Sequence, residues 1–196
     1  MKTKTILTAI IIMASLLACE KPVIEEATGN DDPESANVIL RFVRYDKEDF
    51  DTRSATDVTN VCSRLNLALF SADGTKVKTI AQKKGDTNYG TVTLAISPGT
   101  YKLVVIAHNG DGTATITAED KVTFPNNKVT DTFYYYGTLE VSTEQKTHEL
   151  VLTRAVAMFR LILTDSQIPS SVSKFTFYYL GGSSTFSPLA GYGCVN

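Results

Sequence analysis

The chain has 196 residues, with 19 lysine and arginine residues against 21 aspartate and glutamate residues and a formal net charge of −2. This balance leaves no basic surface of the kind that nucleic acids require, so we expect no nucleic-acid partner. Tryptophan is absent, whereas tyrosine and phenylalanine each occur nine times, and together with frequent threonine and valine this composition favours β-strands.

The N-terminus has the pattern of an export signal. Lys2 and Lys4 precede an apolar run from Ile6 to Leu17. The run is shorter than the ~20 apolar residues that a bilayer-spanning helix needs. It matches the apolar region of a secretory signal peptide, which we assign to residues 1–18.

The apolar run ends in LLAC, residues 16–19, which resembles the lipobox of bacterial lipoproteins. The resemblance implies cleavage between Ala18 and Cys19 and a thioether-linked diacylglycerol on Cys19, chemistry that needs a sulfur nucleophile. Cys19 is therefore the predicted lipidation site and the predicted contact with the outer membrane, where stable anchoring takes more than one acyl chain. The alternative is an ordinary signal peptide with a cysteine near its cleavage site.

Residues 19–36 predict a flexible acidic tether. They contain six acidic residues, two prolines and few large apolar side chains. Such a segment cannot bury enough apolar surface to offset its ordering entropy. Without residues 1–18, the positive residues fall from 19 to 17 and the acidic residues stay at 21, so the mature chain carries 17 − 21 = −4.

Residues 37–154 predict one antiparallel β-sandwich domain. Period-two segments recur between turns rich in glycine, aspartate, asparagine and proline, and no window sustains helical spacing. In the segment 64–70, Leu65, Leu67 and Leu69 share one face, and Asp73-Gly74 then marks a hairpin turn. The expected strands cover residues 38–45, 64–70, 90–96, 100–108, 113–117, 131–141 and 148–153.

The period-two alternation of apolar and polar residues continues beyond residue 154. RAVAMFRLILTD (154–165) and SKFTFYYLGG (173–182) both read as further strands with one apolar face. About 40 residues are too few for an independent core, so residues 155–196 either complete the first sandwich or begin a second one. We favour an incomplete C-terminal β domain.

Signatures of catalysis are missing. The sequence has no GxSxG, HExxH, Walker loop, GxGxxG or CxxC motif, so we expect neither enzymatic activity nor a cofactor. His108 and His148 are isolated at strand ends, and we expect surface or edge histidines rather than zinc ligands. Cys62 and Cys194 could pair in an exported protein, but two cysteines far apart in sequence leave the question open.

Several segments in order resemble the fimbrillins of Bacteroidales, which are FimA/FimB-like fimbrial subunit lipoproteins. They are the lipobox, the acidic tether, VILRFVRY, VCSRLNLALFSADGTKV, SPGTYKLVVIAHNG and RAVAMFRLIL. The FimB-like minor or anchoring subunits are the most similar, and residues 178–196 resemble the start of that family's C-terminal domain. The resemblance implies transthyretin-like β-sandwiches in a pilus on the outer membrane, acting in fimbria assembly and cell adhesion.

The resemblance also implies other fimbrial subunits as partners, through donor-strand exchange. In polymerising members an arginine-specific protease removes the first strand, and a neighbour's strand fills the groove by β-augmentation. Anchor-type members keep their lipid and are not cut. Here the first strand is residues 38–45, and Arg53 is the only arginine of the polar loop 46–60. Arg53-Ser54 is thus the candidate processing site, unless Arg53 is simply a solvated loop residue.

A second hypothesis is a surface glycan-binding β-sandwich lipoprotein. Such proteins share the lipobox, the tether and the sandwiches, and the aromatic run at residues 133–136 could stack on sugars. Sugar platforms usually expose tryptophan, which this chain lacks, and packing within a strand explains the run as well.

Overall fold

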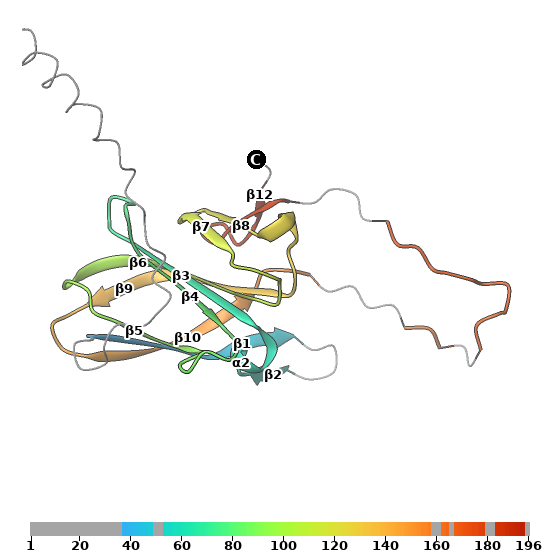
Figure 1. Ribbon diagram of the computed structural model, residues 1–196, viewed down its shortest axis with the longest axis horizontal. Coiled ribbons are helices and arrows are strands. Elements are labelled where there is room, and N and C mark those ends of the chain that lie inside the picture. The colour runs from blue at the N-terminus through green and yellow to red at the C-terminus, as the bar shows by residue number, and fades with distance from the viewer. Residues whose placement is uncertain (1–36, 49–52, 158–161, 165–166, 179–182, 195–196) are drawn as a thin grey trace, which may run out of the picture.

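The computed structural model describes residues 37–48, 53–157, 162–164, 167–178 and 183–194, and nearly all of its regular secondary structure is β-strand (Figure 1). The predicted all-β sandwich class is therefore confirmed. The elements in chain order are β1 (Val38–Glu48), β2 (Arg53–Thr56), α2 (Val58–Val61), β3 (Arg64–Phe70), β4 (Lys76–Lys83), β5 (Thr91–Leu94), β6 (Gly99–His108), β7 (Thr115–Ala118), β8 (Lys121–Thr123), the 3-10 turn η1 (Pro125–Asn127), β9 (Thr132–Val141), β10 (Lys146–Arg154), β11 (Thr185–Ser187) and β12 (Tyr192–Cys194).

One long sheet folds over to make both layers of the sandwich. Its strand order is β2-β1-β10-β9-β6-β3-β4, and β5 also pairs with β1. The pairs β4-β3, β3-β6 and β6-β9 are antiparallel, whereas β1 runs parallel to β10. The two halves join where Thr153 and Arg154 of β10 pair with Tyr134 and Phe133 of β9. This short junction is the corner of the sandwich.

The main core lies between the two halves and follows the predicted alternation. Leu65, Leu67 and Leu69 of β3 all point into it, as the sequence pattern predicts. The opposite half contributes buried side chains from β1, β5 and β10 to the same cluster: Val38, Leu40, Phe42, Val92, Leu94, Leu150 and Leu152. The side-chain period of two in each strand thus produces one continuous apolar layer.

A small third layer covers the other face of β3 and β6, a feature that the sequence did not predict. The sheet β12-β11-β8-β7 lies on the opposite side of β3 and β6 from β1 and β10 (Figure 1). A second apolar cluster fills this interface: Ala68, Phe70, Val104, Ile106, Ala114, Ile116, Val122, Phe124 and Phe186. Because both faces are covered, β3 is buried at almost every position rather than at every second one.

The β3–β4 turn forms where the sequence predicts it. Gly74 adopts a positive φ of 82°, a conformation that glycine takes without steric cost. The Asp73 carboxylate accepts a hydrogen bond from the Thr75 backbone N–H at 3.0 Å, and it also accepts from the Ser71 hydroxyl. The aspartate and glycine together therefore close this hairpin.

The two strands predicted after residue 154 are wrong within the described residues. Residues 155–157, 162–164 and 167–178 contain no strand, and several apolar side chains there are exposed: Ile162, Leu163, Ile168, Val172, Phe175 and Phe177. Alternation supplies one apolar face, but a strand also needs a partner for its backbone groups. The later segment β11 finds that partner in β8, and β12 pairs with β11. A domain boundary near residue 154 stays a prediction.

Candidate functional site

The first strand occupies an interior position in the sheet. β1 pairs in parallel with β10 from Val38↔Lys146 to Tyr45↔Leu152, with an irregularity between Arg41 and Arg44. On its other side it pairs antiparallel with β5 and, further along, with β2. The backbone of β1 is therefore hydrogen-bonded to a neighbouring strand on each side. We call the position between β10 and β5 the β1 slot.

Three side chains anchor β1 in the core. Val38, Leu40 and Phe42 are 1%, 0% and 1% exposed. Full burial of an apolar side chain of this size contributes roughly 1.5–3 kcal/mol, so the three together contribute on the order of 6 kcal/mol. A domain of this size has a total stability of only about 5–15 kcal/mol. A domain with an empty β1 slot would therefore lose most of its stability.

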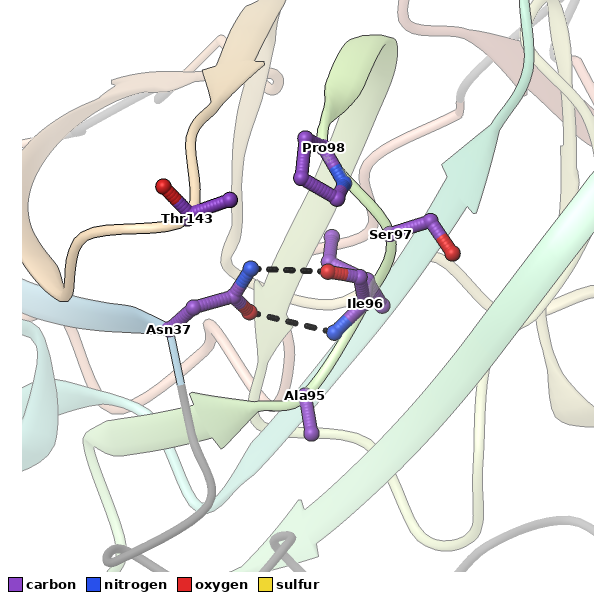
Figure 2. A pocket seen from close by; sticks show the side chains of 6 residues that line it. All are labelled: Asn37, Ala95, Ile96, Ser97, Pro98 and Thr143. Atoms are coloured by element: carbon purple, nitrogen blue, oxygen red, sulfur yellow. Dashed lines mark hydrogen bonds between the residues drawn. The ribbon is translucent and has the colours of Figure 1, made fainter.

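Asn37 latches the entrance of the slot (Figure 2). Its side-chain N–H donates to the backbone oxygens of Ile96 at 2.7 Å and Ser142 at 3.0 Å, and its Oδ1 accepts from the Ile96 N–H at 3.1 Å. The side-chain amide of Asn37 thus makes the same pair of hydrogen bonds with the Ile96 backbone that a residue of a neighbouring strand would make. Its backbone continues the ladders on both sides, donating to Leu94 O and accepting from Lys146 N–H.

A shallow pocket of about 440 Å³ opens beside this latch. Figure 2 shows the six residues that line it: Asn37, Ala95, Ile96, Ser97, Pro98 and Thr143. Asn37 was not among the site residues predicted from the sequence, and only its place directly before the alternating run of β1 could have drawn attention to it. The pocket therefore lies at the start of β1.

The candidate processing site lies in a strand and not in a loop. Arg53 is the first residue of β2, where it pairs with Glu48, and Ser54 pairs with Lys47. Within the described residues the predicted loop 46–60 was wrong, because β1 extends to Glu48 and β2 pairs antiparallel with it. A protease would have to open this ladder before cutting, since a substrate chain must leave its sheet to enter an active site. Cleavage at Arg53-Ser54 remains a prediction.

The predicted signal cleavage and lipidation residues, Ala18 and Cys19, lie outside the described residues. Cys62 and Cys194 are both free thiols in the structure. Cys62 is buried in the main core, whereas Cys194 lies in β12 of the third layer. Burial raises the pKa of the Cys62 thiol to about 12, and the negative charge of Asp131 adds to this effect. Cys62 is therefore a packing residue with little thiolate character.

The expectation of surface or edge histidines was wrong for His108, which is buried and lies between β3 and β9, whereas His148 is half-buried. His108 is 0% exposed, because the third layer covers the end of β6. Its Nδ1 accepts from the Gly110 N–H at 3.0 Å, and its Nε2 lies 3.2 Å from Asn66 Oδ1, so Nε2 carries the proton. Desolvation, assisted by the Arg64 charge, lowers the pKa of His108 to about 4. His148 faces inward beside Leu40, with a buried Nε2 that has no hydrogen-bond partner.

The aromatic run at residues 133–136 packs inside the fold. Phe133 is part of the main core, Tyr135 packs against it, and Tyr134 and Tyr136 pack against the second cluster. The Tyr136 hydroxyl donates to Glu119 Oε2 at 2.7 Å. Phe133 is buried and the three tyrosines are half-buried against the two clusters, so strand packing accounts for the run.

The sandwich corner is fixed by a forked ion pair. The Arg154 guanidinium donates to Asp131 Oδ1 at 2.6 Å and to Oδ2 at 2.7 Å. Its central carbon lies 5.4 Å from the centre of the Phe133 ring, within cation–π range. A planar guanidinium that binds both carboxylate oxygens also fixes the orientation of the two side chains relative to each other. This contact therefore holds the end of β10 against β9.

Within the described part of the chain, no group of three or more histidine, cysteine, aspartate or glutamate side chains could hold a metal ion. Within the same residues, none of the helices has the length and apolar character needed to cross a bilayer.

The family model of the fimbrillin-A-associated anchor proteins Mfa1 and Mfa2 matches residues 28–192 of this chain. No curated protein matches the sequence.

Solved structures with some likeness include a candidate polysaccharide-binding protein of Bacteroides thetaiotaomicron, at 14% identity and a TM-score of 0.47, covering 61% of this chain and 47% of that one. A candidate adhesin of Bacteroides ovatus has 14% identity and a TM-score of 0.46, over 61% and 47% of the two chains. A fimbrial assembly protein of Parabacteroides distasonis has 15% identity and a TM-score of 0.32, over 60% and 50%. The chain spans about half the length of these structures.

Proposed function

Because the chain belongs to the family of fimbrillin-A-associated anchor proteins Mfa1 and Mfa2, we propose that it is a lipid-anchored fimbrial subunit of minor or anchoring rank. It acts at the cell surface in fimbria assembly and cell adhesion. Cys19 carries the lipid that attaches it to the outer membrane, and residues 20–36 form the tether between lipid and domain. Its partners are other fimbrial subunits, which it meets by β-strand complementation.

The observation that carries this proposal is the position of β1. The strand that follows the predicted tether lies between two partner strands and buries Val38, Leu40 and Phe42 completely. A slot of this kind offers backbone groups along its length and apolar pockets at alternate positions, which is what a complementing strand recognises. While β1 stays in place, it fills the β1 slot, and the lipid on Cys19 remains covalently linked to the folded domain.

Two features favour a retained β1 over a released one. Asn37 latches the entrance of the slot with three side-chain hydrogen bonds. Arg53, the candidate cleavage residue, is paired in β2 with Glu48. Both contacts raise the free energy needed to open this region for a protease. Retention of β1 with its lipid is the behaviour of an anchoring subunit.

The anchoring part is tested by mass spectrometry of the mature N-terminus of protein taken from its native membrane. We expect a diacylated Cys19 and a chain intact through Arg53. The variant Cys19→Ala should move the protein out of the membrane fraction, and the matched control Cys194→Ala should leave it there. Unlipidated Cys19 in the mature chain would refute the anchor, and a new N-terminus at Ser54 would refute retention of β1.

The complementation part is tested on the purified chain with a weakened first strand. Leu40→Asp places a charge in the core and should loosen β1, and Phe42→Ala is the milder version for use if the first variant does not fold. A peptide with the sequence of residues 37–48 should bind either variant and raise its melting temperature. The control peptide has serine at positions 38, 40 and 42. Equal binding of both peptides, or of neither, would count against the proposal.

A further inference from the structure

The hairpin formed by β11 and β12 docks on the outer face of the sandwich from a distant point in the sequence. β11 pairs with β8 at Thr185↔Thr123 and Phe186↔Val122. Phe186 is 4% exposed within the second apolar cluster. Its ring lies 4.9 Å from the Tyr134 ring of β9, at an interplanar angle of 69°. One aromatic side chain and two pairs of ladder residues therefore attach the hairpin.

The hairpin satisfies its own polar groups. The Thr185 hydroxyl donates to Cys194 O at 2.8 Å, and the Gly191 N–H donates to Ser187 O at 2.8 Å. The Ser187 hydroxyl accepts from the Ala190 N–H at 3.2 Å. The hairpin can therefore leave β8 as a unit and expose few unpaired backbone groups of its own.

The turn of the hairpin is also fitted to the body of the protein. Gly191 has a positive φ of 79°, and a Cβ there would lie 2.7 Å from the Tyr134 hydroxyl oxygen. The docking site on β8 and β9 is thus complementary to this hairpin in particular, because it accepts an aromatic side chain at position 186 and a glycine turn over Tyr134.

A long connection separates the hairpin from the rest of the fold. β10 ends at Arg154 and β11 begins at Thr185, so 30 residues lie between them. Those of the 30 that the structure describes contain no helix or strand. Fully extended, 30 residues span up to about 100 Å. The connection can therefore reach the β8 edge of a neighbouring molecule.

We propose that the β8 edge is a strand-acceptor site that exchanges the β11–β12 hairpin with a second copy of this chain. In the exchanged dimer, β11 of each copy pairs with β8 of the other, and Phe186 of each fills the other's second cluster. The two sites are identical, so the dimer is closed and two-fold symmetric. This exchange is separate from the strand complementation at the β1 slot and does not depend on lipid attachment.

The same contacts form within one copy or between two, so concentration decides which form is populated. A connection of this length gives the hairpin an effective concentration on the order of 1 mM at its own β8 edge. The chain should therefore be monomeric at micromolar concentration and exchange its hairpins when crowded at millimolar concentration.

The test uses disulfide trapping across the β8–β11 pair. Thr123→Cys and Thr185→Cys are introduced into a chain that also carries Cys19→Ala and Cys194→Ser. Equal amounts of isotopically light and heavy protein are mixed at about 0.01 mM and at about 3 mM, on either side of the effective concentration. The samples are then oxidised and digested, and cross-linked peptides are identified by mass.

We expect only same-isotope cross-links in the dilute sample and a large share of light–heavy cross-links in the concentrated one. The control pair Lys102→Cys and Thr138→Cys joins β6 to β9, where no exchange is expected, and should give same-isotope cross-links at both concentrations. Adding Phe186→Ala to the test pair should lower the yield of both kinds of cross-link. Absence of light–heavy cross-links at about 3 mM, absence of any cross-link, or light–heavy cross-links in the control would each overturn the proposal.

Discussion

The side chain of Asn37 can be removed without touching the core, which makes it the sharpest probe of how β1 is held. Asn37→Ala deletes three hydrogen bonds, two to carbonyl oxygens and one to the Ile96 N–H. Each contributes about 1 kcal/mol net, because the adjacent pocket lets water replace part of what is lost. We therefore expect the free energy of unfolding to fall by about 3 kcal/mol.

Asn37→Asp is the more selective change. A carboxylate has the same shape and can still accept from the Ile96 N–H, but it cannot donate to the two carbonyl oxygens and it repels them. It should destabilise the protein at pH 7 at least as much as alanine does. Such a result would show that donation by the amide, and not the volume of the side chain, holds the entrance of the slot.

The measurement is urea denaturation, with the midpoint compared at constant slope, together with hydrogen exchange at the Ile96 and Lys146 amides. The Ile96 amide should exchange faster in Asn37→Ala, because it loses its side-chain acceptor. The Lys146 amide donates to the backbone oxygen of Asn37, so in both variants its faster exchange would report opening at the start of β1. The matched control is Asn60→Ala, at an exposed position of α2, which should change stability by less than about 0.5 kcal/mol. A loss below about 1 kcal/mol in both Asn37 variants would refute the latch.

The buried and paired side chains give three further predictions. Because the pKa of His108 is about 4 in the fold, against an ordinary value of 6.5, the unfolded chain binds more protons between these values. Stability should thus fall by about 3 kcal/mol as pH drops from 6.5 to 4, and His108→Gln should flatten that part of the urea-midpoint profile. Arg154→Lys keeps the charge but loses the fork to Asp131. It should cost about 1–2 kcal/mol, and a double variant with Asp131→Asn should lose no more than the larger single effect. At pH 8 an alkylating reagent should modify Cys194 and spare Cys62 until urea unfolds the chain, as followed by mass; early labelling of Cys62 would contradict its burial.

Local patterns in the sequence determine the inward face of β3 and the turn that follows it. The alternation of Leu65, Leu67 and Leu69 identifies the inward face of β3 before any partner is known, because the side-chain period of a strand is a property of its own backbone. The turn at Gly74 is likewise local, since a positive φ strongly favours glycine. These features needed no tertiary information.

Pairing between distant segments was decided only by the tertiary structure. The segments around residues 162 and 175 alternate apolar and polar residues as β1 does, yet their described residues form no strand. A strand exists only when another segment supplies its hydrogen-bond ladder. His108 sits at a strand end like a surface histidine, and it is buried because the third layer lies over it. Asn37 becomes a latch because Ile96 and Ser142, far away in sequence, meet at its side chain. The sequence by itself determined which segments can be strands and which of their faces are apolar. Only the tertiary structure decided which strand pairs with which, because pairing depends on contacts between distant segments that no local pattern contains.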